Sequence, residues 1–301
     1  MTESAHNVKV LAVTGPTATG KTALAVRLAR VFGGEVVSVD SRQVYRGLDI
    51  GSGKDLEEYA SVPYHLIDVA DPAAEVYHLH RFCREAYAAI ADIARRGRLP
   101  VLCGGSALYL AALLQEYRLP GGELPLRSEG DLRRHQPEGA EPSFTPPFHL
   151  DPLVLGVYYE RAVVRERIAR RLDARLAAGL LDEVRRLHEK DGVSLEKLEF
   201  FGLEYREAAR VLRGECTPEE MRGTLLNRIR QFAKRQDIFF RKMEREGVVI
   251  HWLREGREPD PEKLVGLFLA GKPLPPPGFR LADIRYAPAS GGKPKRPEAH
   301  T

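Results

Sequence analysis

A phosphate-binding motif lies near the N-terminus of the chain. Its residues fit the pattern GxxxxGK[ST] and are Gly15, Pro16, Thr17, Ala18, Thr19, Gly20, Lys21 and Thr22. In such a motif the backbone N–H groups curl around phosphate oxygens, and the N-terminus of the following helix adds positive potential. Lys21 would neutralise the outer phosphate, and the Thr22 hydroxyl can ligate Mg²⁺. The motif predicts a di- or triphosphate ligand without saying which one.

Two more polar residues follow apolar runs that we interpret as strands. Asp40 comes directly after the run 35–39, and Ser106 follows the run 99–103 and two glycines. Because ligands of open α/β sheets bind at the carboxyl ends of the strands, we expect both residues near the phosphate motif. Asp40 could hold Mg²⁺, accept a proton or merely start a turn. Ser106 could contact the phosphate or only cap the next helix.

The elements that must position these residues alternate along the chain. Apolar runs predict strands over residues 8–13, 35–39, 99–103, 153–157 and 248–253. Apolar periodicity predicts helices over residues 22–32, 79–96, 107–115, 161–178, 180–188 and 203–212. Thr217, Pro218 and Glu220 form a helix-start signature, and this helix should run to about Glu246. The alternation predicts an α/β fold with a parallel sheet flanked by helices.

Composition limits the class of protein. The chain has 301 residues, of which 43% are hydrophobic and 29% charged, and its net charge is +4. We find neither a secretory leader nor an apolar run of about 18 residues that could cross a membrane. Cys83, Cys103 and Cys216 are scattered without metal-ligand spacing, which favours a reducing cytoplasm and argues against zinc and disulfides. The mild positive charge by itself only weakly indicates nucleic acid.

Two segments interrupt the alternation. Residues 118–152 contain seven prolines and four glycines without sustained periodicity, so we interpret them as a long loop. The proline-rich stretch 273–301 ends in basic and polar residues and is expected to be a disordered tail. The remaining chain, residues 1–272, is then one domain that carries the C-terminal helices.

Eight short blocks together carry a family resemblance. They cover residues 15–22, 38–45, 47–51, 62–68, 104–109, 167–173, 179–184 and 230–236. In composition and order they resemble the tRNA dimethylallyltransferase (tRNA isopentenyltransferase) family. The resemblance implies a P-loop, nucleotide-kinase-like domain that transfers a dimethylallyl group to the N6 amine of the adenosine 3′ of the anticodon.

The resemblance also implies roles for individual residues. Residues 15–22 would bind the diphosphate of dimethylallyl diphosphate, with Lys21 and Thr22 holding it and its Mg²⁺ and Ser106 adding a hydroxyl contact. Asp40 would be the general base for the adenine amine. Arg230 and Arg235 are our candidates for a further contact to the diphosphate.

The expected partner is the anticodon arm of tRNA, bound by a monomeric protein. The resemblance places Asp40, Ser41, Arg42, Gln43 and Ser106 in contact with it. The helix expected over 217–246 carries eight Lys or Arg residues against five Asp or Glu, so it could lie along an RNA backbone. On charge alone, a solvated amphipathic helix is the better interpretation.

Some features depart from the family pattern and leave alternatives open. Family members carry a helical insertion domain where this chain has only residues 118–152. Short variants of this kind also fit an adenylate dimethylallyltransferase, which prenylates a free nucleotide. A small-molecule kinase would use the loop for ATP and Asp40 to activate a hydroxyl. A non-catalytic RNA-binding relative is a further alternative, although Lys21, Thr22 and Asp40 argue against it.

Overall fold

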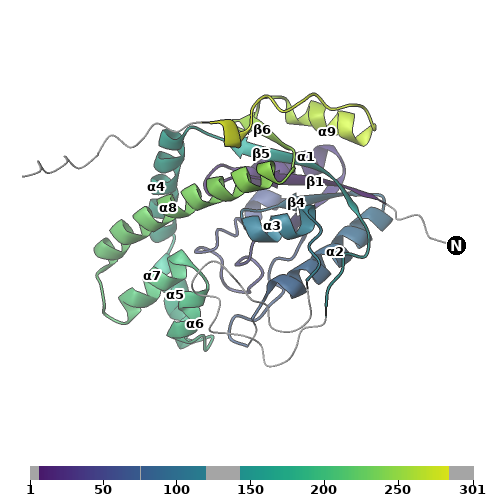
Figure 1. The fold of residues 1–301 in the computed structure, drawn as a ribbon. Coiled ribbons are helices and arrows are strands. Elements are labelled where there is room, and N and C mark those ends of the chain that lie inside the picture. Colours follow the sequence, from purple (N-terminus) through teal and green to yellow (C-terminus); the bar gives the residue numbers. More distant parts are fainter. Residues whose placement is uncertain (1–6, 75, 120–142, 285–301) are drawn as a thin grey trace, which may run out of the picture.

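A parallel sheet forms the centre of the molecule in the computed structural model, which describes residues 7–74, 76–119 and 143–284 (Figure 1). Six strands hydrogen-bond in the order β3-β2-β4-β1-β5-β6, and every pairing is parallel. They are β1 (Val8–Thr14), β2 (Gly34–Ser38), β3 (Tyr64–His65), β4 (Leu99–Cys103), β5 (Leu150–Tyr158) and β6 (Ile250–Arg254). The predicted α/β class is confirmed.

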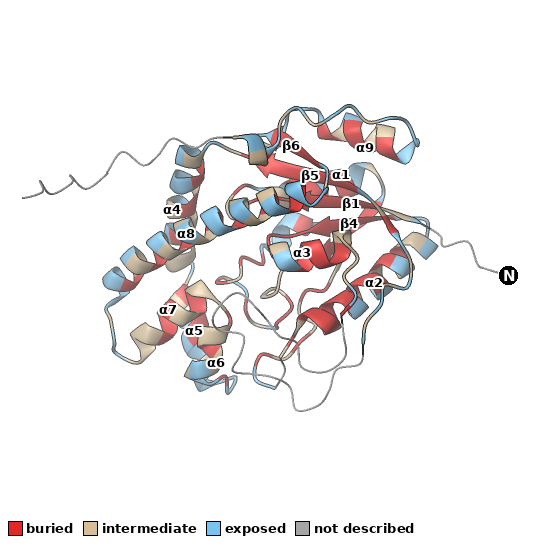
Figure 2. Ribbon diagram, in the orientation of Figure 1, coloured by how far each residue is buried: buried red, intermediate tan, exposed pale blue. Residues whose placement is uncertain are grey.

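Helices cover both faces of the sheet. The α1 helix (Lys21–Val31) and α9 (Pro261–Leu269) lie on one face, and α2 (Leu79–Arg95), α3 (Ala107–Leu114) and α8 (Pro218–Arg245) lie on the other. Side chains alternate across a strand, so Leu11 and Val13 join the core beneath α1 and α9 while Val10 and Ala12 join the opposite core. Figure 2 shows the result as buried strands and helices buried along their inner sides.

Four helices group beside the carboxyl ends of the strands (Figure 1). They are α4 (Arg161–Ala177), α5 (Leu180–Glu189), α6 (Leu195–Phe200) and α7 (Leu203–Leu212). Gly179 separates the first two because its left-handed φ of 95° suits glycine and ends α4. The capping box of Thr217 and Glu220 starts α8 as the sequence predicts. Among the helices described, none is long and apolar enough to cross a membrane.

Several short elements were not predicted. The segment 47–72, for which no helix or strand was predicted, contains the 3-10 helix η1 (Leu56–Tyr59) and the two-residue strand β3. Neither β3 nor the six-residue α6 is long enough to show a period. The helix α9 was also missed, although Asp260 caps it and Pro261 begins it.

The interpretation of residues 118–152 as a loop is wrong at its C-terminal end. Leu150 to Pro152 form the start of β5 in register with Val8 to Val10. Proline is tolerated there because β6 pairs with β5 only from Val154 onward, so Pro152 has one neighbouring strand. Residues 120–142 of this segment lie outside the described residues.

The first part of the stretch 273–301, expected to be a disordered tail, is ordered against the rest of the protein. Leu281, in the short 3-10 helix η3 (Leu281–Asp283), is 1% exposed, and its amide donates to Glu244 of α8 at 3.1 Å. The amide of Ala282 donates to the same carboxylate at 2.8 Å. Composition suggested disorder from residue 273, but apolar burial and these hydrogen bonds hold the chain against α8 as far as residue 284. Residues 285–301 lie outside the described part.

A buried ion pair at the start of β2 predicts a pH-dependent stability. Hydrogen bonds from Arg96, and next from His65, lower the pKa of Glu35 to about 2. The folded pKa lies below the ~4.3 of an unfolded glutamate, so the charged carboxylate stabilises the fold above that pH. This contribution is lost as the pH falls through about 2.

We expect Glu35→Gln to destabilise the protein by roughly 2 kcal/mol near neutral pH and by progressively less below pH ~4. Thermal unfolding of both proteins at a series of pH values measures the difference. The exposed substitution Glu57→Gln serves as the control and should stay within ~0.5 kcal/mol at every pH. If Glu35→Gln lowers the free energy of unfolding equally at neutral and acidic pH, the prediction is contradicted.

Candidate functional site

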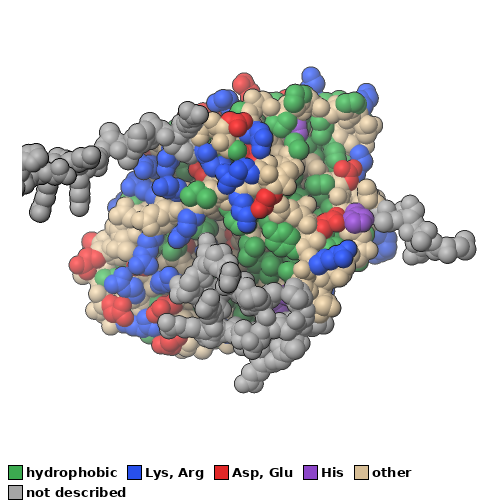
Figure 3. All heavy atoms as spheres, in the orientation of Figure 1, with side chains coloured by type: hydrophobic (Ala, Val, Ile, Leu, Met, Phe, Trp, Pro, Cys, Tyr) green, Lys and Arg blue, Asp and Glu red, His purple; other side chains and the backbone are tan. Residues whose placement is uncertain are grey.

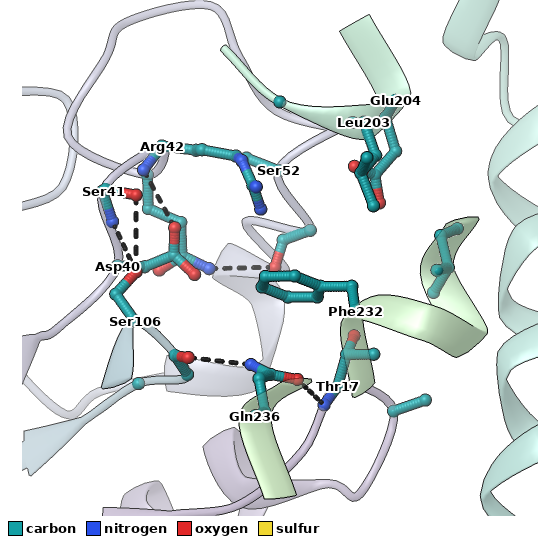
Figure 4. Close-up of a pocket in the computed structure, with 18 of the residues that line it drawn as sticks. Thr17, Asp40, Ser41, Arg42, Ser52, Ser106, Leu203, Glu204, Phe232 and Gln236 are labelled. Atoms are coloured by element: carbon teal, nitrogen blue, oxygen red, sulfur yellow. Dashed lines mark hydrogen bonds between the residues drawn. The ribbon is translucent and has the colours of Figure 1, made fainter. Parts of the chain in front are cut away.

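A cavity of about 950 Å³ opens beside the carboxyl ends of the strands, which is where open α/β sheets bind ligands. The phosphate motif after β1, the turn after β2 and the turn after β4 line its sheet side. Residues of α4, α7 and α8 line the opposite side. The close-up in Figure 4 shows side chains of the phosphate motif, of the turns after β2 and β4, and of α7 and α8 around this space.

The phosphate motif forms a tight loop between β1 and α1. Gly15 has φ 150°, and a Cβ there would lie 2.8 Å from the carbonyl oxygen of Val157, so only glycine fits. The Thr19 hydroxyl donates to the Pro16 carbonyl at 2.8 Å and closes the loop. The motif residues that line the cavity are Thr17, Ala18, Gly20, Lys21 and Thr22. Gly15, Pro16 and Thr19 are not among the lining residues and shape the loop.

Lys21 is the charged residue of this loop. Its Nζ donates to the Pro16 carbonyl at 3.3 Å. Burial, and next the Arg171 guanidinium, lowers the pKa of Lys21 to about 8. The lysine is therefore largely charged at neutral pH, but an anion that binds beside it would stabilise the charged form further.

This shift predicts how pH affects binding of a diphosphate ester. Because the bound anion favours charged Lys21, affinity should be constant well below pH 8 and should fall above pH 8 with a slope that approaches roughly tenfold per pH unit. Calorimetric titration with dimethylallyl diphosphate over this range measures the slope. Lys21→Arg should remove the slope, since a guanidinium keeps its proton to pH ~12. A slope that persists in Lys21→Arg would show that another group titrates.

Asp40 lies in a turn that follows β2. Its Oδ1 accepts a hydrogen bond from the Arg42 amide at 2.9 Å, and the carboxylate lines the cavity (Figure 4). Starting a turn and facing the ligand space are therefore compatible roles for this residue. The side chain of Gln43, in the same turn, connects it to a second loop: its Nε2 donates to the Gly53 carbonyl at 3.1 Å.

Ser106 lies between the phosphate loop and Asp40, since β4 lies between β1 and β2 in the sheet. Ser106 is the N-cap residue of α3, as expected, but its side chain makes no capping hydrogen bond. The Ser106 hydroxyl instead accepts from the Ser41 amide at 3.0 Å. The predicted residues Asp40, Ser41, Arg42, Gln43 and Ser106 all line the same cavity.

Arg42 reaches across the cavity toward α8. Its guanidinium carbon lies 5.5 Å from the centre of the Phe232 ring, a cation–π distance. A Cβ on Gly202 would lie 2.2 Å from Arg42 Nε, so the glycine before α7 makes room for this side chain. Arg42 and Phe232 thus form a basic and aromatic wall (Figure 4).

The arginines nearest the phosphate loop come from α4 and were not predicted as site residues. Arg167 Nε donates to the Ala18 carbonyl at 2.7 Å, and Arg171 Nη1 donates to the Thr17 hydroxyl at 3.3 Å. One turn further, Arg175 donates to the Gly51 carbonyl at 3.1 Å. Burial, followed by the nearby Arg175, lowers the pKa of Arg171. The spacing of four residues, which places all three on one helix face, was the available signal.

The two arginines predicted from α8 are placed differently. Arg235 is exposed and lines the cavity, whereas Arg230 is not among the residues that line it. Over the whole lining, Lys and Arg outnumber Asp and Glu two to one. The cavity therefore suits an anionic ligand, with its positive charge concentrated on the phosphate loop and α4.

A buried carboxylate holds the loop that faces α4. Glu183 of α5 is 7% exposed and accepts from the amides of Ile50 and Gly51 at 2.6 and 3.0 Å. It also accepts from the Tyr205 hydroxyl at 2.8 Å. These bonds hold the loop whose Gly51 and Gly53 carbonyls accept from Arg175 and Gln43. Glu183 therefore stabilises this part of the cavity wall.

Comparison with known proteins gives consistent matches over most of the chain. The family model described as IPP transferase matches residues 43–142 and 126–243, and the one described as isopentenyl transferase matches residues 8–62. The tRNA dimethylallyltransferase 1 of Geotalea uraniireducens is 43% identical over 83% of this chain and 94% of its own length. The tRNA dimethylallyltransferase 2 of Syntrophotalea carbinolica is 45% identical over 83% and 95%.

Solved structures agree with these relatives. The tRNA isopentenylpyrophosphate transferase of Bacillus halodurans is 30% identical, with a TM-score of 0.68 over 88% of this chain and 96% of that one. A eukaryotic dimethylallyltransferase acting on tRNA shares the fold, with a TM-score of 0.70 at 24% identity. The phosphate loop, the carboxylate at the end of β2 and these matches lead to one conclusion: the chain belongs to the tRNA dimethylallyltransferase family.

Proposed function

We propose that this protein transfers a dimethylallyl group from dimethylallyl diphosphate to the N6 amine of the adenosine 3′ of the anticodon in tRNA. The observation that carries the proposal is one cavity in which a phosphate-binding loop and the Asp40 carboxylate face the same space. Family membership supports this choice over the adenylate and kinase alternatives.

The donor side binds the leaving group. Breaking the allylic carbon–oxygen bond places negative charge on the departing diphosphate, and preorganised cations and amides stabilise that charge. Lys21 and the loop amides supply this stabilisation from the sheet side. Arg171, which contacts Thr17, is the best-placed arginine for the same anion and replaces Arg230 as our candidate.

The residues present also fit Mg²⁺. In the described part of the chain no three His, Cys, Asp or Glu residues cluster as a metal site. Mg²⁺ commonly uses one or two protein oxygens together with substrate phosphates, and Thr22 is among the loop residues that line the cavity. Thr22 would therefore hold the ion with the diphosphate, where Mg²⁺ would neutralise charge on the leaving group.

The acceptor side removes a proton. As the amine nitrogen bonds to the allylic carbon and the carbon–oxygen bond breaks, Asp40 accepts the proton that the amine loses. Phe232 and Phe239 of α8 line the same cavity and offer aromatic surface on which a base can stack. Diphosphate and prenylated adenosine are the products.

We also propose that the chain has lost most of an insertion domain between α3 and β5. The match to the IPP transferase model falls into two pieces that overlap at residues 126–142. The alignment with the Geotalea relative is 288 positions long but covers only 83% of the 301 residues of this chain. Some positions of the relative therefore have no counterpart here. Both observations support a shortened segment.

The rest of the RNA would then lie along α8. Lys234 and Arg235 are exposed on this helix next to the cavity residue Gln236, and Figure 3 shows Lys and Arg side chains scattered over this face. Arg222 and Arg228, by contrast, are paired with Asp173 and Glu207. We take the protein to act in the cytoplasm, as its tRNA substrate and scattered cysteines suggest. We also propose that it acts as a monomer.

A transfer assay tests the proposal. Labelled dimethylallyl diphosphate and Mg²⁺ are offered with unmodified tRNA, with the same tRNA carrying guanosine 3′ of the anticodon, and separately with AMP, ADP and ATP. We expect label in the first tRNA alone. Label in a free nucleotide would establish the adenylate alternative, and ATP consumption without donor would establish a kinase.

A further inference from the structure

We propose that Gln236 is a positioning residue that fixes the donor-binding loop relative to the acceptor side of the cavity. The proposal rests on the transfer reaction proposed above. Gln236 lies on α8 and is 5% exposed. It is thus on a different element from Lys21 and Asp40, which follow strands of the sheet. Its amide connects two loops that follow different strands.

The two ends of the Gln236 amide bind backbone groups on either side of it (Figure 4). Its Oε1 accepts from the Thr17 amide in the phosphate loop at 2.9 Å. Its Nε2 donates to the Gly105 carbonyl, in the turn after β4, at 2.7 Å. A glutamine can do both because its side chain carries one acceptor and one donor group.

The glycine at position 105 allows this close approach. A Cβ on Gly105 would lie 2.9 Å from Gln236 Nε2 and 3.3 Å from Lys21 Cε. Gly105 therefore lies in contact with both Lys21 and the side chain of Gln236. A larger residue at position 105 would displace one or both of these side chains.

The connection continues to the proposed base. Ser106 follows Gly105, and its hydroxyl accepts from the Ser41 amide at 3.0 Å, next to Asp40. Hydrogen bonds thus run from the phosphate loop through Gln236, the β4 turn and Ser106 to the Asp40 turn. Transfer requires the amine and the allylic carbon to be aligned, and a misplacement of about 1 Å can cost ~10²-fold in rate.

The first test is Gln236→Leu, which keeps approximate volume but removes both hydrogen bonds. Single-turnover rates are measured with enzyme in excess over tRNA and saturating donor, and the donor dissociation constant is measured separately. We expect the rate to fall roughly 10- to 100-fold. Donor and tRNA dissociation constants should change by less than about threefold, since neither loop loses its own ligand contacts.

Two further variants separate positioning from stability. Gln115→Leu removes side-chain hydrogen bonds to Glu246 and from Tyr117 outside the cavity, and should leave the single-turnover rate unchanged. Gln236→Asn keeps the amide but shortens the side chain by one methylene, so it should fold well and still lose rate. Full activity of both Gln236 variants, or a weaker donor affinity at unchanged rate, would overturn the proposal.

Hydrogen exchange gives a readout that needs no catalysis. The Thr17 amide should exchange faster in Gln236→Leu than in the wild type, whereas Gln115→Leu should not change it. Unchanged exchange at Thr17 would overturn the link itself. A wild type that fails to prenylate tRNA would overturn the proposed function instead, so the two failures are distinguishable.

Discussion

Lys21→Ala is expected to weaken binding of dimethylallyl diphosphate by roughly 100-fold, because removing one partner of a buried charge pair typically costs 2–5 kcal/mol. The rate at saturating donor should also fall by about 10²–10³, since charge on the leaving group grows in the transition state. The remaining arginines on α4 would keep the cavity positive but cannot occupy the position of Nζ inside the loop.

Calorimetry of donor binding and single-turnover transfer measure the two effects separately. Lys263→Ala, at an exposed position of α9 outside the cavity lining, is the matched control and should alter neither. Full donor affinity in Lys21→Ala would remove the assignment of the loop as the diphosphate site. It would direct attention to the α4 arginines alone.

Asp40→Asn is expected to slow transfer by roughly 10²–10⁴ while leaving donor binding unchanged, because the amide cannot accept the proton of the amine. Asparagine keeps an oxygen that can accept from the Arg42 amide, so the turn after β2 should survive. The substitution therefore removes the base without removing the structural role that the same residue has.

Single-turnover transfer with tRNA, together with donor titration, checks this prediction. Asp182→Asn, on an exposed position of α5, is the control for loss of one carboxylate and should have no effect. An unchanged rate in Asp40→Asn would reduce Asp40 to a turn residue. A reduced donor affinity would instead place its carboxylate among the groups that hold Mg²⁺.

The sequence by itself determined the features that depend on near neighbours. The motif ending in Lys21 and Thr22, the strand before it and the helix after it are one continuous pattern, so they could be predicted together. Asp40 and Ser106 could be placed at the same edge because parallel strands bring their carboxyl ends together. The start of α8 followed from Thr217 and Glu220, which interact three residues apart.

The tertiary structure alone decided which distant helices complete the cavity. Arg167 contacts Ala18 across 149 residues of chain, and Gln236 contacts Thr17 across 219. Many basic residues on α4 and α8 have similar local surroundings, so no local rule separates Arg171, at the phosphate loop, from Arg230, outside the lining. Helix periodicity says which residues share a face, but the packing of that face against a particular loop depends on contacts summed over the whole core.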